Sequence, residues 1–482
     1  MDKYIGRYNF NDKNVLVAGL GLSGTQVVRV LQEHDVPVIT VDEKKDNADY
    51  QSFKDINWDL INLIIISPVF SPYEPWVQEA LKRHIPIWSE IEFAWRTQAT
   101  NTIIGKESPW IGITGTNGKT TTTKMIAALF HAAHKKAPAV GNTGVSLTNA
   151  AQEQDNDVLC VELSSFELHF TNTMNLDIAV WMNVDQDHLD WHHGFDNYCY
   201  DKSKIFNNAQ KAIIYNNDDP KVAALAQTAV VGPHCQKIGF TLHNPETGMI
   251  GIHDGWVIDK ALDSSPEGRK IIALADFNNA LKNNQGDVYP HLQSDALAAI
   301  TAGLVYGLSI DNIKQALSTF HTDRHRLEFV TEVTLSPGEP TLRFIDDSKA
   351  TNAHATKASL MSFPDHSVIW IAGGLAKGAH FEELLHDCKA KIKAVVLIGK
   401  DKTAFLNAIH QELGTVPCIS IDDNHLEHSL MEDTVNNAMS FGKPGDTVLL
   451  APAAASMDQF KNMGDRGDQF ADAARAWVQQ HE

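Results

Sequence analysis

The feature that most constrains this chain is a short glycine-rich segment between an apolar run and a helical stretch. The run Trp110–Ile113 reads as a strand, a helix is expected from about Thr122, and residues 115–121 between them read G-T-N-G-K-T-T. In such a turn the backbone N–H groups bind phosphate, the lysine reaches the outer phosphates and the hydroxyl of Thr120 binds Mg²⁺. The general P-loop has one more glycine, at the position of Ile113, so this loop is a shorter variant. The segment predicts binding of ATP or a close relative.

A second glycine cluster follows the first predicted strand, Val15–Ala18. Residues Gly19 to Gly24 have the spacing G-x-G-x-x-G, and Asp42 stands eighteen residues beyond them. Small residues let the backbone approach a diphosphate, and the following helix N-terminus favours its negative charge. The pattern alone leaves three interpretations open: a nicotinamide dinucleotide, a nucleotide-sugar, or a tight turn without a ligand.

Alternation of strands and helices predicts three consecutive α/β domains, at residues 1–105, 106–322 and 323–482. A polar linker at residues 96–107 follows the first, and the pattern changes again near Asp323. Besides those above, strands are predicted at Val36–Val41, Leu60–Ile66, Val158–Val161, Ile178–Met182, Ala212–Tyr215, Leu342–Ile345, Val368–Ala372, Ala394–Ile398 and Thr447–Leu450, and a helix at Asp295–Gly307.

The composition is that of a folded enzyme. The chain has 482 residues, of which 43% are hydrophobic and 21% are charged, so wholesale disorder is excluded. Lysine and arginine number 40 against 60 acidic residues, which gives a formal net charge of −20. A chain this acidic repels a phosphate backbone, so no nucleic-acid partner is expected. A small anionic substrate remains compatible, because a metal ion or a few lysines can reverse the charge locally.

Cysteine usage and hydropathy predict an intracellular protein. The five cysteines are far apart and form no C-x-x-C pair, which fits a reducing cytoplasm without disulfides or structural zinc. The first residues contain no apolar stretch typical of a signal peptide. The longest apolar run, near Leu60–Ile66, is far shorter than the roughly 20 residues that a membrane span needs.

Polar residues are expected at the carboxyl ends of the central strands, where ligands gather in parallel sheets. Glu162 ends one strand facing the glycine-rich turn, which suits a metal ligand better than a helix cap. His188 lies among three acidic residues past the next strand and is either a metal ligand or a solvated histidine. From spacing alone, Lys202 reads as a solvated helix lysine, and His192-His193 reads as surface without chemistry. The polar run Asp346–Asn352 is either a ligand loop or a capped helix start.

Taken together, these segments resemble the Mur ligase family. The resemblance rests on Thr114–Thr121, Glu162–Phe166, Asp187–Asp190 and His325–Glu328. Within the family, the D-glutamate-adding branch is indicated by Gly19–Gly24, Asp347–Asn352, Gly373–Gly378, Ser456–Phe460 and Arg466–Asp468. The likeness covers essentially the whole chain in the right order. The run Asp347–Asn352 discriminates most, because sister ligases for other amino acids carry different sequences there.

The resemblance implies a three-domain α/β fold: an N-terminal Rossmann-like domain for the UDP moiety, a central P-loop ATPase-type parallel sheet and a C-terminal Rossmann-like domain for the amino acid. It implies that ATP phosphorylates the alanyl carboxylate of UDP-N-acetylmuramoyl-L-alanine (UDP-MurNAc-L-Ala), and that the amine of D-glutamate displaces phosphate from the acyl phosphate. A carboxylate is a poor electrophile, so phosphorylation supplies the leaving group. Mg²⁺ and lysines neutralise the three anionic reactants. We expect a cytoplasmic monomer of peptidoglycan-precursor synthesis.

The resemblance also assigns site residues, with Lys119, His188 and Lys202 as the catalytic ones. It implies two Mg²⁺ sites, with Lys202 carbamylated so that it is an anionic ligand. The expected metal ligands are Thr120, Glu162, His188 and carbamylated Lys202. The expected ATP contacts are Gly115, Thr116, Asn117, Gly118, Lys119, Thr120, Thr121, Arg326 and Asp347. The expected UDP-substrate contacts are Gly21, Leu22, Ser23, Asp42, Asn142 and Ser164, and those of D-glutamate are Lys349, Thr351, Lys377 and Ser456.

Several residues depart from the family pattern. Val69 stands where a glycine is usual after Ser-Pro, and Glu167 stands where glutamine is usual. Leu292 and Asp295 replace two asparagines, so the family's adenine contact is missing or supplied by a neighbour. Met463 replaces an aromatic residue near the D-glutamate site. Because none of these lies in the phosphate loop or the metal set, we expect the chemistry to be retained while affinities differ.

Three other functions are compatible with parts of the pattern. A related Mur or folylpolyglutamate-type ligase that adds another amino acid shares the central motifs. A dehydrogenase built on Gly19–Gly24 leaves the second glycine-rich loop unexplained. An ATP-gated binding module without chemistry leaves unexplained why Lys119, Glu162, His188 and Lys202 occur together.

Overall fold

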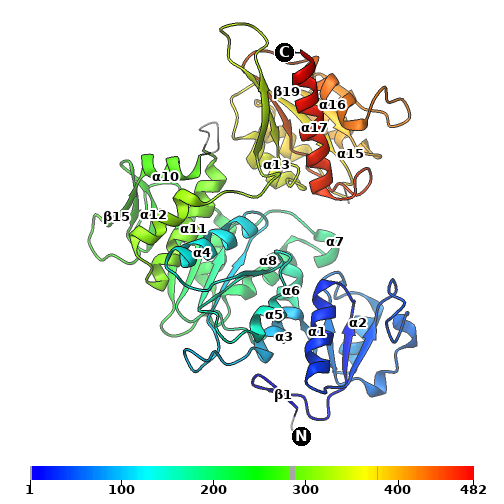
Figure 1. Ribbon diagram of the computed structural model, residues 1–482, viewed down its shortest axis with the longest axis vertical. Helices are drawn as coiled ribbons and strands as arrows, with labels where there is room; N and C mark the ends of the chain where they lie inside the picture. Colours follow the sequence, from blue (N-terminus) through cyan, green and yellow to red (C-terminus); the bar gives the residue numbers. More distant parts are fainter. Residues whose placement is uncertain (1–2, 283–287, 377, 482) are drawn as a thin grey trace. The chain divides into compact units, whose positions relative to one another are not determined.

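The computed structural model describes residues 3–282, 288–376 and 378–481, so Lys377, a predicted D-glutamate contact, lies outside the described residues. The chain forms two compact units. The first comprises residues 1–281 and 292–320, and the second comprises residues 282–291 and 321–482. Each unit is described by itself (Figure 1).

The N-terminal part of the first unit is built on a parallel four-stranded sheet of order β4-β3-β5-β6 (Figure 1). Side chains alternate between its faces, so Leu16 and Ala18 pack toward α2 while Val15 and Val17 pack toward α1. The elements are β1 (Tyr4–Ile5), β2 (Tyr8–Asn9), β3 (Val15–Ala18), α1 (Leu22–Glu33), β4 (Val38–Val41), η1 (Phe53–Asp55), η2 (Trp58–Leu60), β5 (Leu63–Ile66), α2 (Pro75–Lys82), β6 (Ile87–Ser89) and α3 (Glu90–Thr97).

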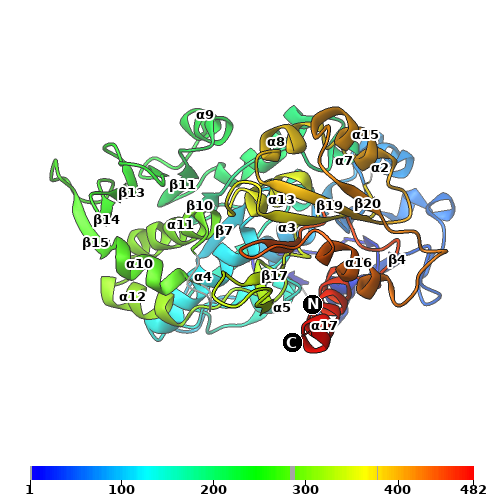
Figure 2. The same cartoon turned by 90° about the horizontal axis from the view of Figure 1, so that it is seen from above.

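The central part of the first unit contains a nine-stranded sheet of order β15-β14-β13-β12-β11-β10-β7-β9-β8. Neighbouring strands pair in parallel except at one edge, where β14 runs antiparallel to both β13 and β15. Both views show α4 beside α12 (Figures 1 and 2), and these helices contact each other.

The strands of this sheet are β7 (Trp110–Thr114), β8 (Ala139–Gly141), β9 (Leu159–Glu162), β10 (Ile178–Trp181), β11 (Ala212–Asn216), β12 (Gln236–Phe240), β13 (Met249–His253), β14 (Trp256–Asp259) and β15 (Arg269–Ala273). The helices are α4 (Lys119–Ala132), α5 (Leu147–Gln152), α6 (Ser165–His169), α7 (Leu189–His192), α8 (Phe195–Ser203), η3 (Lys204–Phe206), α9 (Pro220–Thr228), α10 (Leu274–Leu281), α11 (Pro290–Tyr306) and α12 (Ile310–Thr319).

The second unit has a six-stranded sheet of order β16-β17-β21-β18-β19-β20, in which only β16 is antiparallel to its neighbour. Its core packs the sheet against α16 and α17. The elements are β16 (Glu328–Val333), β17 (Leu342–Asp346), α13 (Ala353–Leu360), β18 (Val368–Gly373), α14 (Glu382–Cys388), β19 (Ile392–Ile398), α15 (Thr403–Glu412), β20 (Cys418–Ser420), α16 (Leu430–Met439), β21 (Thr447–Leu450) and α17 (Met463–His481).

The predicted strands are present with shifts of a few residues at their ends, and β21 has the predicted bounds. The helix after the phosphate loop begins at Lys119, three residues before the predicted start. The reason is Gly118, whose φ of 80° turns the chain directly into the helix. In the described part of the chain, no helix is both long enough and apolar enough to cross a membrane.

Candidate active site

The glycine-rich loop connects β7 to the N-terminus of α4. Gly118 has a left-handed backbone, and a Cβ at this position would lie 2.3 Å from Oδ1 of Asp295. Glycine is therefore required for both conformation and space. The first N–H groups of a fourteen-residue helix face outward from this turn, which is the geometry that binds phosphate.

Lys119 is the first residue of α4, and its side chain folds back over the loop. Its Nζ donates to the carbonyl oxygens of Gly115 and Thr116, both at 2.9 Å. Thr116 is held in turn by its hydroxyl, which lies 3.0 Å from the hydroxyl of Tyr198. The loop conformation and the position of its cation are thus fixed by contacts within the site.

Glu162, the last residue of β9, accepts hydrogen bonds from two other predicted site residues. Thr120 Oγ1 donates to Glu162 Oε2 at 2.8 Å, and Asn142 Nδ2 donates to Glu162 Oε1 at 3.0 Å. Only 2% of Glu162 is exposed, and among the described residues no lysine or arginine forms an ion pair with it. A buried carboxylate without a cation is costly, so this arrangement fits a divalent ion. The hydroxyl and carboxylate oxygens here are ligands that Mg²⁺ accepts.

Ser164 is the N-cap residue of α6. Its Oγ donates to Glu167 Oε2 at 2.7 Å, its N–H donates to the same oxygen at 2.9 Å, and the Glu167 N–H donates to Ser164 Oγ. This capping box uses the acid at position 167, where the family usually has glutamine. Burial raises the pKa of Glu167 to about 7.

Lys202 lies on α8 and is buried, so the prediction of a solvated lysine from spacing alone is wrong. Its Nζ donates to the carbonyl oxygen of Gly115 at 2.7 Å and to Thr114 Oγ1 at 3.4 Å, which places it beside the phosphate loop. Burial and the nearby Lys119 hold the pKa of Lys202 well below its usual value. The neutral amine is the form that adds carbon dioxide, so this lysine fits the carbamate that the resemblance implies.

His188 stands on the loop after β10 with a left-handed backbone, φ 52°. Its ring packs edge-on against Phe166 at 4.7 Å, and its Nε2 lies 3.6 Å from Asp187 Oδ2. Burial lowers the pKa of His188, and the positive charges of Lys202 and Lys119 add to this effect. The histidine therefore shares one electrostatic environment with both lysines.

The nearby His192 is buried, with 1% exposed, so its predicted surface position is wrong, whereas His193 is exposed. The burial is tolerated because both ring nitrogens of His192 have partners: Nδ1 lies 3.0 Å from Asp201 Oδ2, and Nε2 lies 3.0 Å from Ser165 Oγ. The sequence gives no periodic signal for this pairing, since the partners are nine and 27 residues away.

At the N-terminal glycine turn, Asp42 holds the loop itself. Its Oδ2 accepts from the Leu20 N–H at 2.7 Å, and its Oδ1 accepts from the Lys44 N–H at 2.8 Å. Gly21 and Leu22 are exposed, and Ser23 is half-buried at the start of α1. The predicted UDP-substrate residues of this turn therefore lie together at the carboxyl end of β3.

In the second unit, Asp347 and Arg326 come from adjacent loops. Asp347 Oδ1 accepts from the Leu327 N–H at 3.2 Å, and Ser359 Oγ donates to Oδ2. Burial raises the pKa of Asp347 to about 6, while the Ser359 hydrogen bond and the Arg326 charge oppose the rise. The Nε of Arg326 is buried and has no hydrogen-bond partner within the described ranges. An orphaned guanidinium nitrogen fits an anionic ligand.

The predicted D-glutamate residues stand on loops that follow adjacent strands. Lys349 and Thr351 follow β17, while Ser456 follows β21. Lys349 Nζ lies 3.4 Å from Asp323 Oδ2. The loop after β18 reaches the same edge through a bridge between Leu375 and Ala455.

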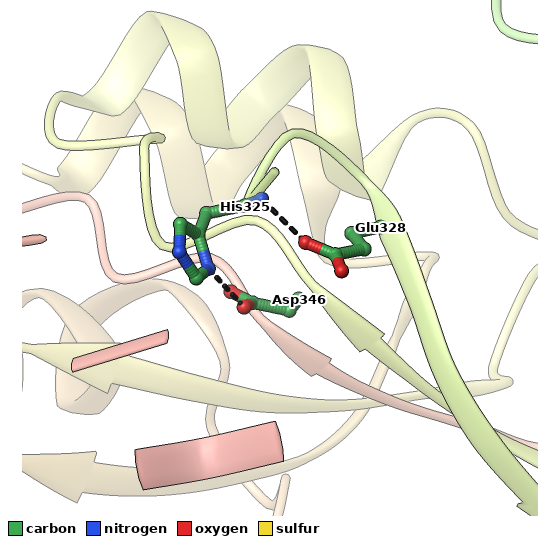
Figure 3. Close-up of side chains that lie close together, drawn as sticks. All are labelled: His325, Glu328 and Asp346. Atoms are coloured by element: carbon green, nitrogen blue, oxygen red, sulfur yellow. Dashed lines mark hydrogen bonds and ion pairs between the residues drawn. The ribbon is translucent and has the colours of Figure 1, made fainter. Parts of the chain in front are cut away.

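Figure 3 shows a cluster of His325, Glu328 and Asp346 behind these loops. His325 Nδ1 lies 2.6 Å from Asp346 Oδ2, and the His325 N–H donates to Glu328 Oε2 at 2.8 Å. The cluster offers ligand-type atoms within 4.8 Å of one another. A Cβ on Gly467 would lie 2.2 Å from His325 Nδ1, so the backbone of α17 packs directly on the pair. We interpret the cluster as a structural group that ties the start of β16 to the end of β17.

Arg466 is a buried residue to which the sequence assigned no role. Its Nε donates to Ser348 Oγ at 2.9 Å, its Nη2 donates to the Ser348 carbonyl at 2.9 Å, and its Nη1 donates to the Ala454 carbonyl at 3.1 Å. It thereby connects the loop after β17 to the loop after β21. The only signal in the sequence is its place in Arg466-Gly467-Asp468, which contributes to the family resemblance.

A glycine-rich loop and a buried acidic strand end on one mostly parallel sheet, with a buried lysine on the helix α8, define an α/β protein. Residues 113–281 match the Mur ligase middle domain, and residues 325–454 match the Mur ligase glutamate ligase domain. A relative from Bifidobacterium adolescentis is 48% identical over 98% of this chain and 99% of its own length. One from Streptomyces coelicolor is 36% identical over 97% and 98%. Both are named UDP-N-acetylmuramoylalanine--D-glutamate ligase. The chain therefore belongs to the Mur ligase family.

Solved structures share the fold at low identity. A UDP-N-acetylmuramate-alanine ligase from Thermotoga maritima aligns with a TM-score of 0.55 and 15% identity, over 96% of this chain and 99% of its own. A pseudomurein peptide ligase type C from Methanothermus fervidus aligns with a TM-score of 0.54 and 18% identity, over 96% and 100%. These similarities extend the multi-domain α/β Mur ligase fold to this chain.

Proposed function

We propose that this protein is an ATP-dependent ligase that joins D-glutamate to UDP-MurNAc-L-Ala through an acyl phosphate, in peptidoglycan-precursor synthesis. The observation that carries the proposal is the similarity to D-glutamate ligases over nearly the full length of both chains. The alternative is a related Mur or folylpolyglutamate-type ligase that adds another amino acid, since the phosphate loop alone does not select the acceptor.

In this proposal the first unit activates the carboxylate. The N–H groups at the start of α4 hold the phosphates of ATP, while Lys119 turns from its loop carbonyls to the outer phosphates. The other phosphate-loop contacts are Gly115, Thr116, Asn117, Gly118, Thr120 and Thr121, and Arg326 and Asp347 are also assigned to the nucleotide. Arg326 Nε, buried and without a partner among the described residues, supports an anionic ligand there.

We assign Thr120, Glu162, His188 and carbamylated Lys202 to two Mg²⁺ sites. The buried Glu162, with which no lysine or arginine of the described residues forms an ion pair, and the lowered pKa of Lys202 support this assignment. Bound Mg²⁺ would supply charge neutralisation as phosphate is transferred. The Thr120 hydroxyl and the Asn142 amide both donate hydrogen bonds to Glu162. These two hydrogen bonds keep the carboxylate fixed while ligands enter.

The remaining residues bind the two substrates that the reaction joins, UDP-MurNAc-L-Ala and D-glutamate. Gly21, Leu22, Ser23, Asp42, Asn142 and Ser164 are assigned to the UDP-substrate, and Lys349, Thr351, Lys377 and Ser456 to D-glutamate. Two lysines suit an amino acid with two carboxylates. We further propose Rossmann-like domains at residues 1–105 and 323–482 around an ATP-binding domain at 106–322. A cytoplasmic location and a monomeric state stay predictions.

Phosphate release tests the proposal. With ATP, Mg²⁺ and UDP-MurNAc-L-Ala, purified protein should release phosphate only when D-glutamate is added. Separate reactions with L-lysine and with a folate acceptor plus glutamate test the alternative. Equal turnover with either one contradicts the D-glutamate assignment.

A further inference from the structure

A buried polar network lies beside the proposed metal site and has no part in the function described so far. Asp201 Oδ2 lies 2.8 Å from His169 Nδ1 and 3.0 Å from His192 Nδ1, and Asp201 Oδ1 lies 3.2 Å from Lys204 Nζ. A carboxylate oxygen only accepts, so each ring Nδ1 carries the proton. The other ring nitrogen of His192, Nε2, lies 3.0 Å from Ser165 Oγ.

The network joins four elements that carry or flank the proposed ligands. Ser165 and His169 are the first and last residues of α6, which starts three residues after Glu162. His192 ends α7, four residues after His188. Asp201 precedes Lys202 on α8, and successive helix residues project about 100° apart. Asp201 accordingly meets α6 and α7, while Lys202 Nζ reaches the carbonyl oxygen of Gly115.

Ser165, His192 and Asp201 contact one another in the same order as the serine, histidine and aspartate of a hydrolase catalytic triad. The burial argues against nucleophilic chemistry, because 3% of Ser165 and 1% of His192 are exposed. Phe166 also lies over the histidine, with the two rings stacked at 5.6 Å and 10°. The network is closed to substrate and joins helices to one another.

We propose that Asp201 is a positioning residue, which fixes Lys202 relative to Glu162 so that both reach one divalent cation. This inference rests on the proposed function, because it takes the metal ligands from it. The mechanism is geometric: without the carboxylate, α8 loses the hydrogen bonds from His169 of α6 and His192 of α7, so that Lys202, the next residue, is positioned less precisely at the phosphate loop. Residues that orient metal ligands typically change metal affinity by roughly 10–100-fold when replaced.

The test measures cation binding directly. Mn²⁺ is titrated into the protein with ADP and, separately, into ADP alone. Free Mn²⁺ is followed by electron paramagnetic resonance, and the difference between the two titrations gives the binding to the protein. Asp201→Asn keeps the side-chain shape but replaces one carboxylate oxygen by a donor, and it should weaken Mn²⁺ binding by about tenfold or more. Asp196→Asn is the matched control, because Asp196 lies on the same helix with its side chain 92% exposed, and it should bind Mn²⁺ like the wild type.

Ser165→Ala is the second variant, and it removes only the hydrogen bond between Ser165 of α6 and His192 of α7. It should fold and weaken Mn²⁺ binding by about threefold, the effect of losing one neutral hydrogen bond. If Asp201→Asn does not fold, Ser165→Ala decides the question. Wild-type affinity for Mn²⁺ in the folded variants, even with a lowered melting temperature, means that the network only stabilises the fold and overturns the inference.

The same titration separates this inference from the proposed function. If the wild type binds no Mn²⁺ with ADP, the metal assignment itself is wrong and the inference falls with it. If the wild type binds Mn²⁺ but does not use D-glutamate, the acceptor assignment fails. The positioning role of Asp201 is then still decided by the Mn²⁺ affinity of its variants.

Discussion

At the scale of single residues, the site depends on ionisable groups that the fold has removed from water. Glu167 is buried behind Ser164, and its pKa rises from the ordinary 4.5 to about 7. The folded protein therefore binds this proton more tightly than the unfolded chain does. The resulting contribution to the free energy of unfolding is fully present below pH 4.5 and is lost as the pH rises through 7.

Replacing Glu167 by glutamine should remove this pH dependence. The amide oxygen still accepts from Ser164, but no charge forms in the buried site at pH 8, where the acid costs up to about 3 kcal/mol. We expect the melting temperature of Glu167→Gln, relative to the wild type, to rise between pH 5 and pH 8. Thermal unfolding across this range measures it, and a difference that stays constant or falls with pH contradicts the buried acid.

Lys202→Ala should lower the ligase activity by about 100-fold or more, because an anionic ligand of the proposed Mg²⁺ is lost. Added formate or acetate should restore part of it by supplying a carboxylate where the carbamate stood. Phosphate release with and without the acids measures both effects. The control is Lys221→Ala, an exposed lysine of α9, which should behave like the wild type. Unchanged turnover in Lys202→Ala removes this residue from the metal site.

The sequence predicts some of these residues and misses others for a physical reason. Glu162 is predictable because it ends a strand, and strand ends meet at one edge of a parallel sheet. Lys202 and His192 were expected at the surface because lysine and histidine usually are. Their burial depends on partners that are distant in sequence, such as Gly115 for Lys202 and Asp201 for His192. Only the family resemblance pointed to a role for Lys202.

At the scale of elements, α17 acts through its backbone as well as its side chains. Arg466 ties together two loops of the second unit, and Gly467 leaves space for the pair formed by His325 and Asp346. The helix itself is readable from its pattern of apolar residues. The need for glycine at position 467 cannot be predicted from the sequence, because it arises from contacts with His325 and Asp346, which are distant in the sequence.

Gly467→Ala should therefore destabilise the second unit. The added Cβ would lie 2.2 Å from His325 Nδ1 and 2.6 Å from Asp346 Oδ2, so side chains or backbone must move, at a cost of about 1–3 kcal/mol. Gly464→Ala is the control on the same helix, since its Cβ would meet no atom closer than 3.1 Å. We expect a melting temperature lowered by about 2–10 °C for Gly467→Ala only. Equal melting temperatures for both variants contradict the tight packing.

At the scale of the whole molecule, an acidic chain is proposed to assemble three anionic reactants. The formal net charge of −20 opposes this, so the cations must be local. Lys119 lies beside the phosphate loop in the first unit, and Arg326 and Lys349 lie on loops of the second. The α/β class followed from strand–helix alternation in the sequence.

The central claim is that ATP activates the alanyl carboxylate before D-glutamate attacks. The most direct test uses UDP-MurNAc-L-Ala labelled with ¹⁸O in that carboxylate, with ATP, Mg²⁺ and D-glutamate, and mass spectrometry of both products. The account predicts one ¹⁸O in each inorganic phosphate released and a nucleotide product heavier by one glutamyl residue. Unlabelled phosphate, or phosphate release without the glutamyl product, would contradict it.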